Sequence, residues 1–258
     1  MTKMKYAKAI YATLIVIFLI APLLVILPLA FTSSAFLTYP IPAFSTRWFE
    51  DLVINSVWSR SIINSLIIAG ATTALATTLG TLAALGLRSQ DLGIKSQIRT
   101  LFLLPMVVPA VVLGVGMQAL FVRLGINSTY LSVILAHTVV AMPLVVISVS
   151  GALTGIDRRV ERGAQSLGAP PWKVFHLVTL PLAMPGVLSG AALAFATSLD
   201  EVVLTLFVAG PNQRTLARQM FSTLRENISP AIASAAFIII MGTVLIALAL
   251  LLARRKRA

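Results

Sequence analysis

The sequence predicts an all-α integral membrane protein, and two observations carry that prediction. Of the 258 residues, 58% are hydrophobic and only 11% are charged, with a mean hydropathy of +0.96. Soluble domains carry about 25% charged residues, so this composition excludes a soluble globular domain. The apolar residues also gather into runs that can span a bilayer, which takes about 20 residues. Six such runs are present, at 9–31, 61–87, 101–122, 131–153, 182–209 and 230–252.

The first run, 9–31, is expected to remain in the protein as a membrane span. It follows Lys3, Lys5 and Lys8, and a basic start before an apolar core is also typical of a secretory signal peptide. The apolar core of a signal peptide covers about 7–15 residues, and this run is longer. Its length therefore favours a retained transmembrane helix.

Two of the other runs have compositions that indicate their surroundings. The run 61–87 is rich in Ala, Gly and Thr, and small residues let helices approach closely in lipid, so we expect it to be buried among other spans. The run 101–122 contains Pro105 and Pro109, which remove two backbone donors. We expect a kinked helix there, which lines a cavity rather than facing lipid.

The basic residues predict how the six spans are oriented. With six spans both termini lie on one side of the membrane, and that side carries 14 of the 20 Lys and Arg residues. Loops rich in Lys and Arg stay in the cytoplasm, so we expect both termini to be cytoplasmic. The net charge of +12 invites a nucleic-acid partner, but topology explains basic residues that lie between apolar runs better. The basic run 254–257 is expected to anchor at anionic lipid headgroups.

The longest polar interruption in the second half of the chain, 161–181, predicts a helical hairpin. Gly168 suits the left-handed position that ends a helix, and Pro171 suits the first turn of the next helix. Leu180 and Pro181 are expected to stop that second helix and to begin another membrane span.

Both helices of this hairpin carry an apolar face. Val160, Ala164 and Leu167 repeat on one face of the first helix. A hairpin this short cannot bury its own apolar faces, so we expect it to dock on a partner; an ordinary amphipathic cytoplasmic loop is the alternative. The apolar stripe of the second helix consists of Val174, Phe175 and Val178.

The hairpin sequence resembles the EAA loop of bacterial ABC-importer permeases. That pattern reads Glu-Ala-Ala, three residues, Gly, nine residues, a branched aliphatic residue, one residue and Leu-Pro. Arg162 stands where the family usually has Glu, and Glu161 lies one position earlier, which bears on any salt bridge that the family makes from this carboxylate. The Gly and Leu-Pro positions keep the docking geometry. The matching residues are Gly163, Ala164, Gly168, Val178, Leu180 and Pro181.

The resemblance implies that a dimer of ATP-binding subunits grips the loop 157–181 and that this loop couples ATP hydrolysis to transport. The residues to which it assigns this role are Glu161, Arg162, Gly163, Ala164, Gly168, Pro171, Lys173, Leu180 and Pro181.

The resemblance extends over nearly the whole chain, and the matching segments look like those of the polyamine-type permeases. It implies a single ABC transmembrane type-1 domain over 1–258, with the MetI-like fold of type I ABC importers and a core from about 60 to 252. The segments that carry it lie at 31–36, 40–52, 64–66, 104–109 and 198–211.

As such a permease, the chain would be the second permease subunit of a spermidine/putrescine-like importer in the bacterial inner membrane. The implied partners are a homologous second permease, the ATP-binding subunit dimer and an extracytoplasmic solute-binding protein. ATP and Mg would be bound by the ATPase, so this chain would not be an enzyme. The same subfamily also carries opines, GABA, aminoethylphosphonate and iron, which remain alternatives. A self-sufficient secondary transporter is a further alternative, but it leaves the docking hairpin unexplained.

A stripe of small residues marks one face of the fifth span. Gly186, Gly190, Ala194 and Ser198 recur every four residues, and such a stripe permits close approach between helices. It suits two roles. One is packing within this subunit, and the other is sliding against a partner permease at the translocation path.

Asp200 and Glu201 follow the stripe within the same apolar run, roughly 27 Å along the expected helix and towards the outer leaflet. Burying a carboxylate in lipid is costly, so both are expected to face the interior of the bundle, water or a cation. Together with Ser198 they would line the path or an outer gate and attract a cationic substrate. Alternatively, they pair with Arg214 or Arg218 and hold the external loop.

The remaining polar residues predict no catalytic or metal site. His137 is the one histidine within a span, where a hydrogen-bonded structural role is favoured over a proton relay in the path. The chain has no cysteine, no phosphate loop of the G-x-x-x-x-G-K-[ST] type and no cluster with metal-ligand spacing. Adjacent residues point about 100° apart around a helix, so Asp200 and Glu201 make a poor acid/base pair.

Overall fold

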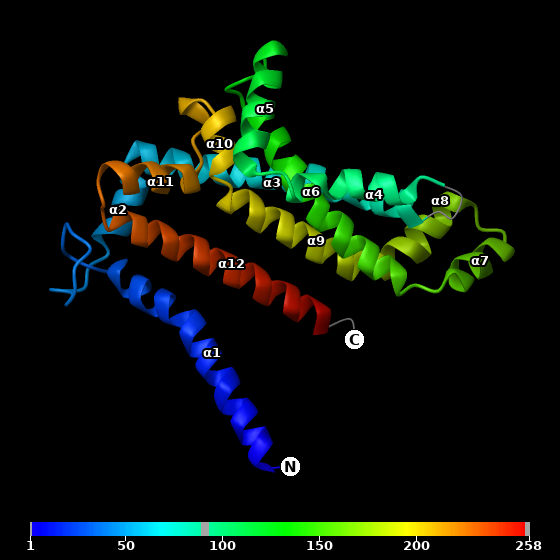
Figure 1. The fold of residues 1–258 in the computed structure, drawn as a ribbon, viewed down its shortest axis with the longest axis horizontal. Helices are drawn as coiled ribbons and strands as arrows, with labels where there is room; N and C mark the ends of the chain where they lie inside the picture. Colours follow the sequence, from blue (N-terminus) through cyan, green and yellow to red (C-terminus); the bar gives the residue numbers. More distant parts are fainter. Residues whose placement is uncertain (1, 89–92, 256–258) are drawn as a thin grey trace. The chain divides into compact units, whose positions relative to one another are not determined.

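The computed structural model of the protein describes residues 2–88 and 93–255, and the prediction of an all-α protein is confirmed for this part of the chain (Figure 1). Besides the helices it contains one isolated antiparallel bridge, between Thr32 and Phe44. The α-helices are α1 (Thr2–Leu29), α2 (Arg47–Ile54), α3 (Ser56–Arg88), α4 (Lys95–Leu103), α5 (Ala110–Arg123), α6 (Tyr130–Thr154), α7 (Arg158–Ser166), α8 (Pro171–Val174), α9 (Leu180–Asp200), α10 (Val203–Val208), α11 (Leu216–Glu226) and α12 (Ala231–Arg255). The basic run 254–257, expected to anchor at headgroups, lies outside the residues whose side chains are described.

The chain forms two compact units, one made of 1–59 with 220–242 and one of 60–219 with 243–258. In the first unit, the rings of Phe31, Phe49 and Phe237 pack together with centroids 5.0–5.6 Å apart. The Ser234 hydroxyl donates a hydrogen bond to the Ala30 carbonyl over 2.9 Å. These contacts fasten the start of α12 to the segment that follows α1.

Four helical segments of the described residues are long and apolar enough to cross a membrane, and a fifth joins them if one bent pair counts as a single span. The shorter apolar helix Ala231–Leu245 lies within the last predicted span. The number of six spans and the side on which the termini lie therefore stay predictions. The four segments are Met4–Leu29, Ser56–Arg88, Tyr130–Thr154 and Pro171–Asp200.

The third predicted span, 101–122, is broken rather than kinked. A short 3-10 turn, Leu104–Met106, follows α4, and the axis bends by 98° before α5 begins. Pro109 takes an extended conformation, with φ −55° and ψ 129°, immediately before α5. A proline has no N–H for the helical ladder and clashes with the preceding turn, so Pro105 and Pro109 together end one helix and begin another.

The fifth predicted span, 182–209, has different bounds from those expected. Leu180 and Pro181 do not stop the preceding helix, because α8 continues through a π-helical turn, Phe175–Thr179, directly into α9. The Leu180 N–H bonds to the Phe175 carbonyl, five residues back, and this wider turn accommodates the Pro181 ring. At its other end α9 stops at Asp200, where Glu201 is extended, and α10 is a separate helix.

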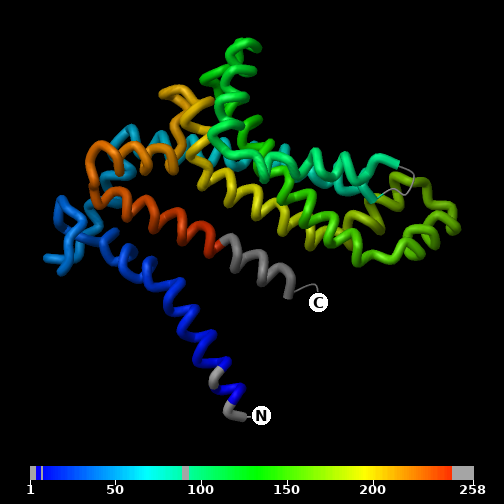
Figure 2. Tube along the Cα trace, in the orientation of Figure 1, coloured from blue at the N-terminus to red at the C-terminus, as the bar shows by residue number. Residues whose placement is uncertain are grey.

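The second unit is built around α6, which packs against α9 and α3 through small residues (Figures 1 and 2). A Cβ atom added to Gly80 of α3 would lie 2.7 Å from the Val145 Cβ of α6, so the backbones approach as closely as a glycine allows. The expected burial of the span 61–87 is therefore found on one face only: Ala69, Thr72 and Ala76 are buried, whereas Leu75 and Leu79 are exposed.

At the other end of α6, α5 and α10 lie side by side and share an apolar cluster with it. A Cβ atom on Gly114 of α5 would lie 2.5 Å from the Phe207 ring of α10. The break after Asp200 thus lets α10 turn away from the axis of α9 and pack on α5.

Candidate functional site

A helical hairpin forms within 157–181 from α7, a glycine turn and α8, although its second helix continues into α9 instead of ending at Leu180. Asp157 caps α7, since its carboxylate accepts a hydrogen bond from the Arg159 N–H over 2.8 Å. Gly168 has φ +82°, the left-handed conformation that a residue without a Cβ adopts at little cost. Pro170 is extended and Pro171 begins α8, so the chain reverses direction within a few residues.

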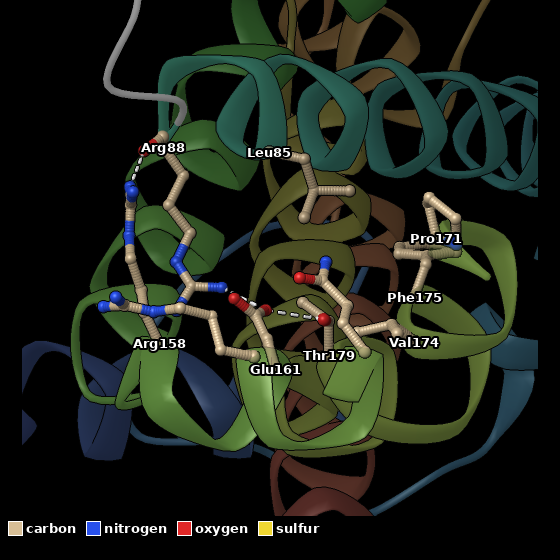
Figure 3. A pocket seen from close by; sticks show the side chains of 10 residues that line it. Leu85, Arg88, Arg158, Glu161, Pro171, Val174, Phe175 and Thr179 are labelled. Carbon is tan, nitrogen blue, oxygen red and sulfur yellow. Dashed lines mark hydrogen bonds and ion pairs between the residues drawn. The ribbon is translucent and has the colours of Figure 1, made fainter. Parts of the chain in front are cut away.

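A polar network ties this hairpin to the end of α3 (Figure 3). Glu161 of α7 forms an ion pair with Arg88, the last residue of α3, and accepts a hydrogen bond from the Thr179 hydroxyl over 2.6 Å. The other guanidinium nitrogen of Arg88 donates to the Ile156 carbonyl over 2.8 Å, and Arg158 donates to the Arg88 carbonyl. The side chains of Arg88 and Glu161 are only 14% and 19% exposed, so this pair is shielded from solvent.

The network lines a cavity of about 540 Å³ between α3, α7 and the π-helical turn. Of the residues expected to form the coupling loop, Glu161, Arg162 and Pro171 lie in its wall. Glu161 keeps its carboxylate in an ion pair although Arg162 occupies the usual position of the acid. The wall consists of Leu85, Arg88, Arg158, Glu161, Arg162, Gln165, Pro171, Val174, Phe175 and Thr179.

The two apolar faces of the hairpin have different surroundings. Val174 of the predicted second stripe is buried and Phe175 and Val178 are partly buried, so this stripe packs on the chain itself rather than awaiting a partner. Leu167, by contrast, is 91% exposed at the turn. Trp172 is 63% exposed, and the Lys173 ammonium lies 5.6 Å from the centre of one of its rings.

The exposed apolar residues extend on both sides of the turn. Val160 on α7 is exposed, and Leu177 on the π-helical turn is 73% exposed. Gly163 and Ala164 lie between Val160 and Leu167 on the same helix. Large apolar side chains at the tip of a rigidly held hairpin are typical of a protein interface.

The stripe on α9 faces α6 within this chain. A Cβ atom on Gly186 would lie 2.4 Å from the Ala152 Cβ, and one on Gly190 would lie 3.0 Å from the Val145 Cα. Ala194 is fully buried in the same cluster of small residues. These contacts describe packing inside the subunit, one of the two roles that the spacing suits.

We call the close contact between α6 and α9 the seam. His137 and Ser198 meet at its end. The His137 ring is fully buried, with one nitrogen 2.8 Å from the Ser198 hydroxyl and the other 2.9 Å from the Thr205 hydroxyl. The histidine therefore joins α6, α9 and α10, and both ring nitrogens have partners. Thr205 gave no signal in the sequence, because its link to His137 depends on the break at Glu201.

Asp200 and Glu201 do not pair with the arginines of the external loop. The Glu201 carboxylate accepts the Leu204 N–H over 2.8 Å and so caps α10, while Asp200 is exposed. Arg214 donates to Gln219 over 2.8 Å, and Arg218 donates to the Ala209 carbonyl over 2.9 Å. The arginines instead hold the loop through neutral acceptors.

The end of α3 opposite Arg88 is held by Asn64. Its amide donates to the carbonyls of Asn212 and Arg214, each over 2.9 Å, and its oxygen accepts the Tyr130 hydroxyl over 2.6 Å. The neighbouring Ser65 accepts the Leu216 N–H over 2.8 Å. These bonds give a structural reason for the Asn-Ser-Leu segment at 64–66 on which the family resemblance partly rests.

The described residues contain no group of three or more His, Cys, Asp or Glu side chains that could hold a metal ion. The arrangement around the hairpin offers an ion pair, hydroxyls and exposed apolar side chains. Its chemistry suits attachment to another protein.

Comparisons with known proteins point to one family. A family model described as "Binding-protein-dependent transport system inner membrane component" matches residues 76–258. The putrescine transport system permease protein PotI of Escherichia coli strain K12 is 35% identical over 230 residues, covering 86% of this chain and 82% of that protein. The spermidine/putrescine transport system permease protein PotC of the same strain is 30% identical over 252 residues, covering 97% and 93%.

A solved structure has the same fold. It is the crystal structure of a bacterial ABC transporter involved in the import of the polysaccharide alginate, and it matches with a TM-score of 0.72 over 99% of this chain and 96% of that one. The sequence identity is 17%, so the likeness concerns the fold alone. It bears out the importer-permease fold that the sequence predicts.

Proposed function

Because this chain belongs to the family of inner membrane components of binding-protein-dependent transport systems, we propose that it forms half of the translocation pathway of a type I ABC importer for polyamines. The names of the relatives PotI and PotC support spermidine or putrescine as the solute class. A homologous permease provides the other half of the pathway. The chain itself carries out transport rather than catalysis, and a partner ATPase binds ATP and Mg.

The observation that carries this proposal is the hairpin at 157–181. Its apolar tip at Leu167 and Trp172 is exposed, while its base is fixed to α3 by Arg88 and Glu161. A partner that grips the tip can therefore displace the ends of α3 and α9 together. Closure of an ATPase dimer on ATP would reach the spans by this route and switch the permease pair between inward-open and outward-open states.

We assign the solute path to the break between α9 and α10. Asp200 is exposed there, and Glu201 caps the first turn of α10, so an exposed carboxylate lies beside the joint between the two helices. Ser198, two residues before Asp200, is buried and bonded to His137 at the end of the α6–α9 seam, so these two side chains support the joint from the protein side. In this proposal, Asp200 and Glu201 attract the cation, and the hydroxyl and imidazole hold the gate in place.

The proposed surroundings follow from the family and from the basic residues. In this proposal the protein lies in the bacterial inner membrane with both termini and the hairpin in the cytoplasm, the orientation that the excess of Lys and Arg on that side favours. An extracytoplasmic solute-binding protein delivers the solute to the opposite face.

The experiment that tests this proposal is ATPase activity of the reconstituted complex with its binding protein, in the presence of putrescine, spermidine, GABA or aminoethylphosphonate. We expect stimulation by a polyamine, and loss of that stimulation when Asp200→Asn is combined with Glu201→Gln. Stimulation that survives both changes would remove the two carboxylates from the path. Failure of any ATPase subunit to co-purify would overturn the importer function itself.

A further inference from the structure

A second cavity, of about 620 Å³, lies beside the hairpin network but opens between other helices. Its size falls within the about 300–1,000 Å³ that are typical of small-molecule sites. The cavity lies among the end of α3, the start of α4 and the end of α6. Its wall consists of Ala84, Leu87, Arg88, Lys95, Ser96, Arg99, Ser150, Leu153, Thr154, Ile156 and Arg158.

The charge of this wall is strongly positive. It contains four basic side chains, and the described residues that line it include no carboxylate. Glu161 neutralises Arg88 from the neighbouring cavity, which leaves Lys95, Arg99 and Arg158 without a counter-charge in the wall. Among the described residues, the side chains of Lys95 and Arg99 form no ion pair, and Arg158 donates to the Arg88 carbonyl, a neutral acceptor.

If α3 and α6 span the bilayer, their ends place this cavity at the level of lipid headgroups. The apolar helix α3 ends at Arg88, α6 ends at Thr154, and α4, the start of the bent pair, begins at Lys95. Leu82 on α3 and Leu101 on α4 are exposed on the spans that lead away from it. A ligand there would have its charged group among the basic residues and apolar surface alongside.

We propose that this cavity is a binding site for the phosphodiester headgroup of an anionic phospholipid, defined by Lys95, Arg99 and Arg158. Basic pockets between spans bind such headgroups because the phosphate is held by several cations at once. The hydroxyls of Ser96 and Ser150 in the wall supply hydrogen bonds to the non-ester oxygens. The acyl chains follow the exposed leucines of α3 and α4. The site is independent of which solute the permease carries.

The test is native mass spectrometry of the full-length chain in detergent, titrated with phosphatidylglycerol or with the zwitterionic phosphatidylethanolamine. We expect phosphatidylglycerol to remain bound, and Lys95→Gln combined with Arg99→Gln to weaken its binding about tenfold or more. The matched control combines Lys5→Gln with Lys8→Gln, which removes the same charge from exposed positions of α1 and should leave binding unchanged. Lys95→Arg with Arg99→Lys should also retain the lipid, which separates loss of charge from misfolding.

Several outcomes would overturn the site. One is equal retention of both lipids, and another is equal loss of lipid from the control variant. Release of the lipid by millimolar inorganic phosphate would assign the cavity to a free anion. Unchanged lipid binding in the Lys95→Gln, Arg99→Gln variant, accompanied by loss of a co-purifying ATPase, would assign it to a protein contact.

Discussion

The seam between α6 and α9 and the hairpin at 157–181 belong to the same compact unit, but different interactions hold them in place. In the seam, Gly186 and Gly190 bring two helices so close that neither glycine position has room for a Cβ atom, and the packed cluster consists of apolar residues. In the hairpin, an ion pair and hydrogen bonds hold the backbone, and the apolar tip is left uncovered.

This difference indicates how the two regions contribute to function. A seam held by van der Waals contact tolerates no added volume, so it keeps the spans in a fixed arrangement. A hairpin held at its base by polar contacts can transmit a displacement without changing its own shape. Substitutions in the seam should therefore lower stability, whereas those at the tip of the hairpin should alter attachment and leave stability unchanged.

The largest effect is expected from Gly186→Ala. The new Cβ would lie 2.4 Å from the Ala152 Cβ and 2.8 Å from the Ser148 carbonyl oxygen, so the two backbones would have to separate. Overpacking of this kind costs about 1–3 kcal/mol, and the thermal unfolding temperature in detergent should fall. The control is Gly151→Ala on α6, where an added Cβ meets no atom within 4 Å. That variant should be unchanged or slightly stabilised, and a similar loss in both would contradict the steric account.

The seam also shows which features of this structure can be predicted from the sequence. The spacing of Gly186, Gly190, Ala194 and Ser198 predicts a contact face, because helical periodicity is a local property. Which helix meets that face is decided by tertiary packing. The spacing alone therefore leaves open both packing within the subunit and sliding against a partner permease, and the contacts with Ala152 and Val145 show the first.

The hairpin shows the same difference: its turn can be predicted from local residues, whereas its contacts with distant residues cannot. Gly168 and Pro171 predict the turn because each restricts its own backbone, and the turn is found where expected. Arg88 and Thr179 were not predicted to bind Glu161, since they lie 73 and 18 residues away along the chain. The helical stop at Leu180 and Pro181 was wrong because the widened turn that accommodates the proline leaves no signature in the sequence.

The next largest effect is expected from the ion pair between Arg88 and Glu161. Both side chains are mostly shielded, so a double-mutant cycle with Arg88→Gln and Glu161→Gln should give a coupling of about 0.5–3 kcal/mol in thermal or denaturant unfolding. The matched control is the pair of Asp157 and Arg159, which are 62% and 88% exposed with their charged atoms 4.0 Å apart.

A cycle on that control, with Asp157→Asn and Arg159→Gln, should give a coupling of about 0–1 kcal/mol because solvent screens an exposed pair. Asn retains a side-chain oxygen that can cap α7, so the variant isolates the charge. Equal couplings in the two cycles would show that shielding does not strengthen the pair that holds the hairpin to α3.

A smaller loss is expected from Gly168→Ala. The position has φ +82°, which costs a residue with a Cβ about 1–2 kcal/mol, although the added atom itself has free space. In the reconstituted importer, uptake should fall more than ATP hydrolysis, because a strained turn no longer sets the angle between α7 and α8. Gly151→Ala on α6, which lies outside the hairpin and has free space around it, is the control and should preserve the ratio of uptake to hydrolysis. Normal coupling in the Gly168 variant would remove the turn from the transmission route.

The smallest effect on stability is expected at the tip, from Leu167→Ser and Trp172→Ser. Both side chains are exposed, so their removal should change the free energy of unfolding by no more than about 0.5 kcal/mol. The same changes should weaken the association of the ATPase with the permease, measured by co-purification or by titration in detergent, because exposed apolar anchors lose their partner pocket. Val53→Ser on α2, where an apolar residue is similarly exposed far along the sequence, is the control. Loss of association without loss of stability would show that Leu167 and Trp172 serve attachment, whereas Gly186 serves stability. Intact association would mean that the partner binds the hairpin elsewhere.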